Sequence, residues 1–177
     1  KPEHNFHDVL RIKTDIQMKY LVEQGKLDGE EARREDYAGK VADSCYRYVL
    51  DVLEHTRPVV KSLSERYKLV LVSNFYGNIQ AVLDDFKLTS YFPVVIESAV
   101  VGVRKPDPAI FRLGVEALAL QPEEVVVIGD SYRKDIQPAQ SLGCDTIWIK
   151  GAGWDDSEAA VQHDKIITDI AQLQELL

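Results

Sequence analysis

The sequence predicts an α/β fold in which a parallel sheet follows a helical module. In residues 56–177, short apolar runs alternate with helix-like segments, which is typical of βαβ units with right-handed crossovers. One run, Val125 to Ile128, has four successive β-branched residues and no polar alternation, as in a strand buried on both faces of a parallel sheet. No strand pattern occurs in residues 1–55. We therefore expect a helical domain over residues 1–55 and an α/β domain over residues 56–177.

The helical domain is predicted from apolar residues that recur at helical spacing after Asp8, with Gly25 as a suitable C-terminal stop. Asp28 and Glu31 have the spacing of a capping box, in which Asp28 is the N-cap and Glu31 bonds back to it. A second long helix then follows, with a possible break near Gly39. Its apolar residues are Tyr37, Val41, Tyr48, Val49 and Val52.

In the α/β domain, Pro58 suits the first turn of a helix that reaches residue 67. Strands and helices then alternate to the end of the chain. The expected strands are 69–72, 93–96, 125–128, 146–149 and an edge strand 165–167, and the expected helices are 78–86, 108–119, 136–142 and 169–176.

Bulk composition limits the possible functions. The 177 residues suffice for one well-buried domain, or for one domain with a small insertion, but not for two large domains. The contents of 45% apolar and 28% charged residues are ordinary for a soluble globular chain. The net charge of −8, with no Lys/Arg cluster longer than two, excludes a nucleic-acid or anionic-membrane surface. Cys45 and Cys144 form no disulfide framework, so we expect buried thiols in a reducing, cytoplasmic environment.

Two polar groups are expected to bind an anion. Ser73 and Asn74 directly follow strand 69–72, and ligands of open α/β sheets bind at the carboxyl ends of strands. Lys105 lies between Arg104 and two prolines at the start of helix 108–119, which has Asp107 as its N-cap. A helix N-terminus prefers anions, so a lysine there favours phosphate binding. The alternatives are turn formation by Ser73 and Asn74 and a solvated Lys105.

A third polar group follows strand 125–128, where Gly129 permits a turn and Asp130 places its carboxylate at the strand end. Asp135 is expected to be the N-cap of the next helix, in which Pro138 lies in the first turn. Acidic oxygens beside the Ser131 hydroxyl suit Mg²⁺, which keeps several waters and bridges to a substrate phosphate. The alternative is that Asp130 and Asp135 only cap turns.

Taken together, these residues resemble motifs two, three and four of the haloacid dehalogenase (HAD) superfamily, in the family's order and spacing. The motifs are Ser73-Asn74, Lys105 within the stretch VRKPDPAIF, and IGDS with Asp135, and the resemblance covers roughly residues 56–153. It implies a Rossmann-like core with an inserted helical (C1-type) cap, which residues 1–55 would form. It also implies that Ser73, Asn74 and Lys105 hold the phosphoryl group.

The resemblance further implies that Asp130 binds Mg²⁺, with Ser131 and Asp135 as supporting residues around the metal. HAD phosphatases carry an Asp-x-Asp motif on their first strand, which supplies the nucleophile and the general acid/base. No residue of this chain occupies those positions, because Asp8, Asp15 and Asp28 lie in helical sequence. In the family that strand lies between the strands that end at Ser73 and Asp130. We therefore expect the native protein to contain an N-terminal segment with this strand.

Two functions of different classes follow. The first is a Mg²⁺-dependent phosphatase that acts on a small phosphorylated metabolite through an aspartyl-phosphate intermediate. The second is a non-catalytic HAD-like domain that binds a phosphorylated ligand or a protein partner. A metal-independent 2-haloacid dehalogenase fits less well, because such relatives typically carry Ser-Ser-Asn where this chain has Gly-Asp-Ser. An upstream Asp-x-Asp motif would favour the enzyme.

Overall fold

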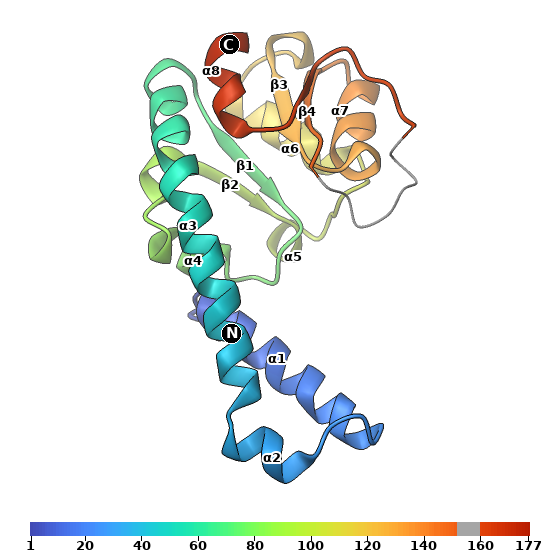
Figure 1. The fold of residues 1–177 in the computed structure, drawn as a ribbon. Helices are drawn as coiled ribbons and strands as arrows, with labels where there is room; N and C mark the ends of the chain where they lie inside the picture. The colour runs from blue at the N-terminus through green and yellow to red at the C-terminus, as the bar shows by residue number, and fades with distance from the viewer. Residues whose placement is uncertain (152–159) are drawn as a thin grey trace. The chain divides into compact units, whose positions relative to one another are not determined.

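The computed structural model describes residues 1–151 and 160–177 (Figure 1). The chain divides into two compact units. The helical unit comprises residues 1–57 and 78–89, and the sheet unit comprises residues 58–77 and 90–177. The division therefore lies close to the predicted boundary after residue 55, but residues 78–89, predicted as part of the α/β domain, belong to the helical unit.

The helical unit is built from α1 (Phe6–Glu23), α2 (Gly29–Arg34), the first part of α3 (Tyr37–Arg66), and α4 (Ile79–Asp85). After α1 the chain turns at Gly25, which has a positive φ of 65°, in agreement with its predicted role as a stop. Asp28 caps α2 as predicted and accepts a hydrogen bond from the Glu31 main-chain N–H at 2.7 Å. The Glu31 carboxylate does not bond back to Asp28 but accepts the Tyr37 hydroxyl hydrogen at 2.7 Å.

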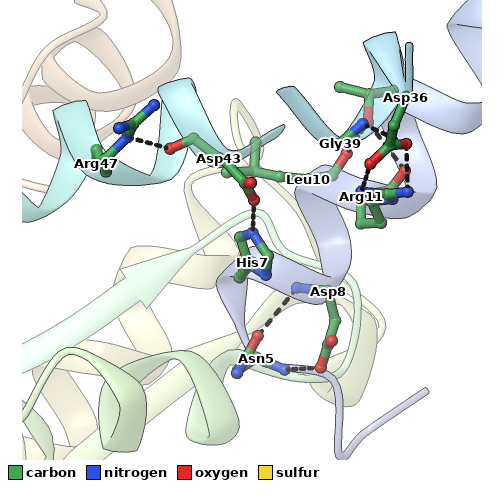
Figure 2. Close-up of polar contacts among 10 residues, drawn as sticks. Asn5, His7, Asp8, Leu10, Arg11, Asp36, Gly39, Asp43 and Arg47 are labelled. Atoms are coloured by element: carbon green, nitrogen blue, oxygen red, sulfur yellow. Dashed lines mark hydrogen bonds and ion pairs between the residues drawn. The ribbon is translucent and has the colours of Figure 1, made fainter. Parts of the chain in front are cut away.

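Helix α3 is continuous at Gly39, so the predicted break is wrong. The glycine instead makes room for an ion pair between α1 and the start of α3, in which Arg11 donates to both Asp36 oxygens at 2.7 and 3.1 Å (Figure 2). A Cβ atom on Gly39 would lie 1.9 Å from an Arg11 guanidinium nitrogen and 2.1 Å from Asp36 Oδ2. Nearby, His7 Nε2 and Asp43 Oδ1 are 2.6 Å apart (Figure 2).

Pro58 lies inside α3, so the prediction that it starts a new helix is also wrong. A proline in a helix interior removes one hydrogen bond. Packing offsets this loss, because α3 has buried apolar side chains on both sides of the proline. These are Leu53 before it and Val59, Val60 and Leu63 after it.

The sheet unit contains only parallel strand pairs among its described residues, as predicted. Strand β1 (Val70–Ser73) pairs with β2 (Val94–Glu97) in one sheet. The second sheet has the order β3 (Val126–Gly129), β4 (Asp145–Ile149), β5 (Ile166–Ile167). Thus β1 and β3, which flank the expected additional strand, belong to separate sheets.

Strand β3 was predicted to be buried on both faces, but the structure shows it only partly buried. Its valines are half-buried and Ile128 is 37% exposed. Within the described residues β3 pairs along one edge only, with β4. A strand needs neighbours on its sides and faces to be fully covered, so this pairing accounts for the exposure.

Helices α5 (Ser98–Val101), α6 (Ala109–Leu118), α7 (Gln137–Ser141) and α8 (Leu173–Leu176) complete the sheet unit. Ile110, Phe111 and Val115 of α6 form a buried cluster that includes Ala139 and Cys144, and half-buried Val72 and Val127 pack against it. A second cluster joins Val59 and Leu63 of α3 to Ile147, Ile167 and Leu173. Both clusters fix the strands whose carboxyl ends carry the predicted site residues. Among the described helices, none is long and apolar enough to cross a membrane.

Candidate active site

The predicted site residues of the sheet unit lie at strand ends and in the loops that follow them. Ser73 is the last residue of β1 and is in register with Glu97, the last residue of β2. Gly129 ends β3, so Asp130 is the first residue beyond that strand. The structure links four of the predicted residues, Asn74, Lys105, Asp135 and Ser131, by direct hydrogen bonds.

Asn74 binds the main chain of Lys105 at two points. Its amide nitrogen donates to the Lys105 carbonyl at 3.0 Å, and its side-chain oxygen accepts from the Lys105 N–H at 2.8 Å. The structure therefore shows Asn74 holding the lysine in place, whereas the sequence predicted an amide directed at a phosphate. A pair of hydrogen bonds to one residue fixes both the position and the orientation of its backbone.

The Lys105 ammonium donates to Asp135 Oδ1 at 2.6 Å. Both side chains are well covered, with exposed fractions of 17% for Lys105 and 6% for Asp135. The solvated-lysine alternative is therefore wrong. A covered ion pair of this kind is screened weakly by salt and holds the ammonium in one place.

Asp135 is not the N-cap that the sequence predicted. It lies within a π-helical turn, Tyr132–Ile136, and Ser131 is the N-cap and accepts from the Lys134 N–H at 3.3 Å. The second Asp135 oxygen, Oδ2, accepts the Ser131 main-chain N–H at 3.1 Å. One carboxylate oxygen of Asp135 thus binds the Lys105 ammonium, and the other binds the Ser131 N–H at the start of the turn.

Gly129 permits this close packing. A Cβ atom on Gly129 would lie 2.3 Å from the Asp135 Cβ and 2.7 Å from its carboxyl carbon. These distances are shorter than side-chain atoms tolerate, so any other residue at position 129 would displace Asp135. The glycine is needed for the approach of Asp135 as well as for the turn that the sequence predicted.

Asp130 is exposed, and its carboxylate forms no hydrogen bond or ion pair with the described residues. Its main-chain carbonyl accepts from the Trp148 indole N–H at 3.1 Å. Among residues 1–151 and 160–177, no group of three His, Cys, Asp or Glu side chains is placed to hold a metal. One carboxylate still fits Mg²⁺, which is commonly bound through one or two carboxylates together with waters and substrate phosphate.

The sequence did not identify two groups of contacts that shape this site. The loop after Asn74 is fixed from the end of β2, because Glu97 accepts from the Gly77 N–H at 2.6 Å and the Ser98 hydroxyl accepts from the Phe75 N–H at 3.2 Å. The second group is the hydrogen bond from the Trp148 indole N–H to the Asp130 main-chain carbonyl. Neither could be found in local sequence patterns, because each joins residues 18 or more positions apart.

Comparison with known proteins places these features in a family. Residues 2–143 match the model of the haloacid dehalogenase-like hydrolases. The chain is 31% identical over 141 residues to haloacid dehalogenase-like hydrolase domain-containing protein 3 of Mus musculus, which covers 75% of this chain and 56% of that protein. It is 30% identical over 152 residues to glyceraldehyde 3-phosphate phosphatase of Pyrococcus furiosus, which covers 79% and 60%.

Among solved structures, a HAD phosphatase from Thermococcus onnurineus superposes with a TM-score of 0.62 at 31% identity and covers 69% of this chain and 56% of that one. A HAD hydrolase from Bacillus subtilis, at 20% identity and a TM-score of 0.60, covers 100% of this chain and 85% of that one, and supports the fold alone. The chain spans 56% and 60% of the lengths of the mouse and Pyrococcus relatives. The family match and the arrangement of the three motifs agree, and the chain belongs to the haloacid dehalogenase-like hydrolases.

Proposed function

We propose that the protein containing this chain is a Mg²⁺-dependent phosphatase of small phosphorylated metabolites. The observation that carries the proposal is the covered ammonium of Lys105, fixed by Asn74 at its main chain and by Asp135 at its side chain. A localised positive charge at the carboxyl ends of parallel strands is suited to a phosphoryl group. Two sequence relatives named as phosphatases, of glyceraldehyde 3-phosphate and of phosphoserine, support the same reaction class.

In the proposed mechanism, the Lys105 ammonium and the Ser73 hydroxyl bind the phosphoryl oxygens. A carboxylate oxygen attacks phosphorus, the bond from phosphorus to the ester oxygen breaks, and the alcohol leaves with a proton. Water then attacks phosphorus, releases inorganic phosphate and restores the carboxylate. No residue of this chain holds the family's position for the attacking aspartate, so the proposal assigns that role outside these 177 residues. The helical unit is proposed to be the cap.

Asp130 is proposed as the residue of this chain that holds Mg²⁺. The ion supplies positive charge that neutralises the phosphoryl oxygens when it is bound. Asp135 has both oxygens engaged by Lys105 and Ser131, so it would support the site by holding these residues. Ser131 would orient the turn that follows Asp130, since its hydroxyl caps that turn.

The second candidate is a non-catalytic domain that binds phosphorylated ligands through the same residues. It is favoured by the contacts that hold Lys105, because a fixed ammonium can bind a phosphoryl group without hydrolysing it. Both candidates require Lys105, but only the enzyme requires a metal and an attacking carboxylate. A test of Asp130 in the complete protein therefore separates them.

The test compares Asp130→Asn with the unaltered complete protein in hydrolysis of 4-nitrophenyl phosphate. We expect most of the Mg²⁺-dependent activity to be lost with little change in stability, because Asp130 is exposed and the substitution removes only a charge that the metal would use. Asp145→Asn, a second carboxylate of the sheet unit, is the control and is expected to keep its activity. Full activity and intact Mg²⁺ dependence in Asp130→Asn would refute the metal assignment. An unaltered protein that binds phosphate but does not hydrolyse the ester would favour the second candidate.

A further inference from the structure

The peptide group between Asp130 and Ser131 is held at both of its polar atoms by side chains. Its carbonyl oxygen accepts from the Trp148 indole at 3.1 Å, and its N–H donates to Asp135 Oδ2 at 3.1 Å. The paired register of β3 and β4 ends at Gly129 and Trp148, so this peptide lies just beyond the sheet ladder. The two side chains thus take over the hydrogen bonds that a strand would otherwise provide.

Trp148 is built into the sheet unit. It is only 1% exposed, and its ring lies 5.5 Å from that of Tyr132 at an interplanar angle of 57°. The Lys150 ammonium lies 4.7 Å from the ring centroid. A buried indole N–H needs an acceptor, and here the acceptor is the main chain of Asp130. The indole is therefore held both at its ring and at its N–H.

We propose that Trp148 is a positioning residue that orients Asp130 for Mg²⁺. This inference rests on the proposed function and extends it from the carboxylate to the residue that fixes its backbone. An aspartate has two side-chain torsions, so a fixed peptide plane restricts where its oxygens can lie. Partners of metal ligands that act in this way typically contribute about 10- to 100-fold to metal affinity.

The two contacts on the peptide group have different consequences. Asp135 also binds Lys105, so its loss would disturb phosphate binding and the Asp130 backbone together. The Trp148 indole N–H donates to Asp130, so its loss should affect the metal more than the phosphoryl group. This difference makes Trp148 the informative residue to change.

The experiment uses Trp148→Phe in the complete protein, which removes the indole N–H and keeps an aromatic ring. Mg²⁺ binding is measured by calorimetry, without substrate, and KM for 4-nitrophenyl phosphate is measured at saturating Mg²⁺. We expect the Mg²⁺ dissociation constant to rise roughly 10-fold or more, and KM to change less than threefold. Ile147→Val is the matched control, because it alters the neighbouring buried residue of β4 and should leave Mg²⁺ affinity within twofold.

A second measurement needs no folded variant at position 148. In the unaltered protein, the Trp148 indole N–H should exchange slowly with solvent, and its NMR signal should shift when Mg²⁺ is added. The chain has two tryptophans, so the signal that remains in Trp154→Phe is that of Trp148. Equal Mg²⁺ affinity in Trp148→Phe and the unaltered protein, or an indole N–H that exchanges freely, would overturn the inference and leave the proposed function intact. An unaltered protein that binds no Mg²⁺ would overturn both.

Discussion

At the scale of single residues, Lys105 is the centre of the candidate site because three contacts hold it. Asn74 fixes its main-chain N–H and carbonyl, and Asp135 binds its ammonium. Such a group needs no rearrangement to meet the charge of a phosphoryl oxygen, and pre-organised charge is the usual source of electrostatic catalysis.

We expect Lys105→Ala to lower kcat/KM for 4-nitrophenyl phosphate by roughly 10²–10³, the range found when one pre-organised electrostatic group is removed. Lys105→Arg should restore part of the loss, because the planar guanidinium cannot occupy the position of the ammonium beside Asp135. Steady-state kinetics of the complete protein test this, with Lys134→Ala as a control at an exposed lysine. Equal activity in all variants would remove Lys105 from the site.

Asp135→Asn is expected to destabilise the protein, because it leaves a covered ammonium without its counter-charge. Removing one partner of a buried ion pair typically lowers the free energy of unfolding by about 3–5 kcal/mol, and the 17% exposure of Lys105 favours the lower end. Urea unfolding measures the change. The double variant Asp135→Asn/Lys105→Met should be less destabilised than Asp135→Asn alone. Strictly additive effects would show that the two side chains do not interact.

At the scale of elements, the ion pair of Arg11 and Asp36 near the start of α3 occupies the space that a Cβ atom on Gly39 would need. Ala normally stabilises a helix interior by about 1 kcal/mol relative to Gly. At position 39 the added Cβ would overlap the Arg11 guanidinium and Asp36 Oδ2. Both are the ends of exposed side chains, so a methyl group would displace them and break the ion pair, which opposes the gain in helix propensity.

We expect Gly39→Ala to change the free energy of unfolding by less than about 1 kcal/mol, because the loss of an exposed ion pair offsets part or all of the gain in helix propensity of about 1 kcal/mol. In a background with Arg11→Ala and Asp36→Ala the ion pair is already absent, so Gly39→Ala should stabilise by the full propensity difference. Thermal unfolding of the unaltered protein, Gly39→Ala, Arg11→Ala/Asp36→Ala and the triple variant compares the effect of Gly39→Ala in the two backgrounds. An equal effect in both backgrounds would contradict the close contact.

At the scale of the whole molecule, the helical unit contains a group that limits stability in alkali. Burial, and then a hydrogen bond to Asp85 Oδ1 at 2.8 Å, raise the pKa of Tyr46 to about 12 from a usual 10.0. The folded state thus prefers the neutral phenol. Its contribution to stability is complete below pH 10, where the unfolded tyrosine titrates, and is lost as the pH rises towards 12.

Urea unfolding followed from about pH 9 to about pH 12 should therefore show a loss of stability that Tyr46→Phe reduces. Tyr46→Phe should also be less stable at neutral pH, because Asp85 Oδ1 loses its donor while Oδ2 is already buried without a partner among the described residues. Tyr48→Phe is the control, since Tyr48 is 70% exposed and should leave the pH profile unchanged. Identical profiles for all three proteins would exclude Tyr46 as the source.

The family, the parallel strand pairs and the positions of Ser73 and Asp130 at strand ends could be predicted from the amino-acid sequence alone. These properties depend on local patterns: apolar runs of β-branched residues, helix caps such as Asp28, and glycine or polar residues directly after strands. Ser73 and Asp130 could be named because each lies at the carboxyl end of a predicted strand, and Lys105 because it lies beside two prolines at a predicted helix start. Their catalytic and metal-binding roles stay predictions.

The contacts of several of these residues could be found only in the folded chain. Asp135 looked like a helix cap because Asp is common there, yet it pairs with a lysine 30 positions away. Pro58 looked like a helix start, but it lies inside α3, which has buried apolar side chains on both sides of the proline. Asn74 and Trp148 hold main-chain groups of Lys105 and Asp130, across 31 and 18 positions. Local sequence sets the preferences of each segment, but burial and long-range hydrogen bonds are large enough to override them, and these exist only once the chain has folded.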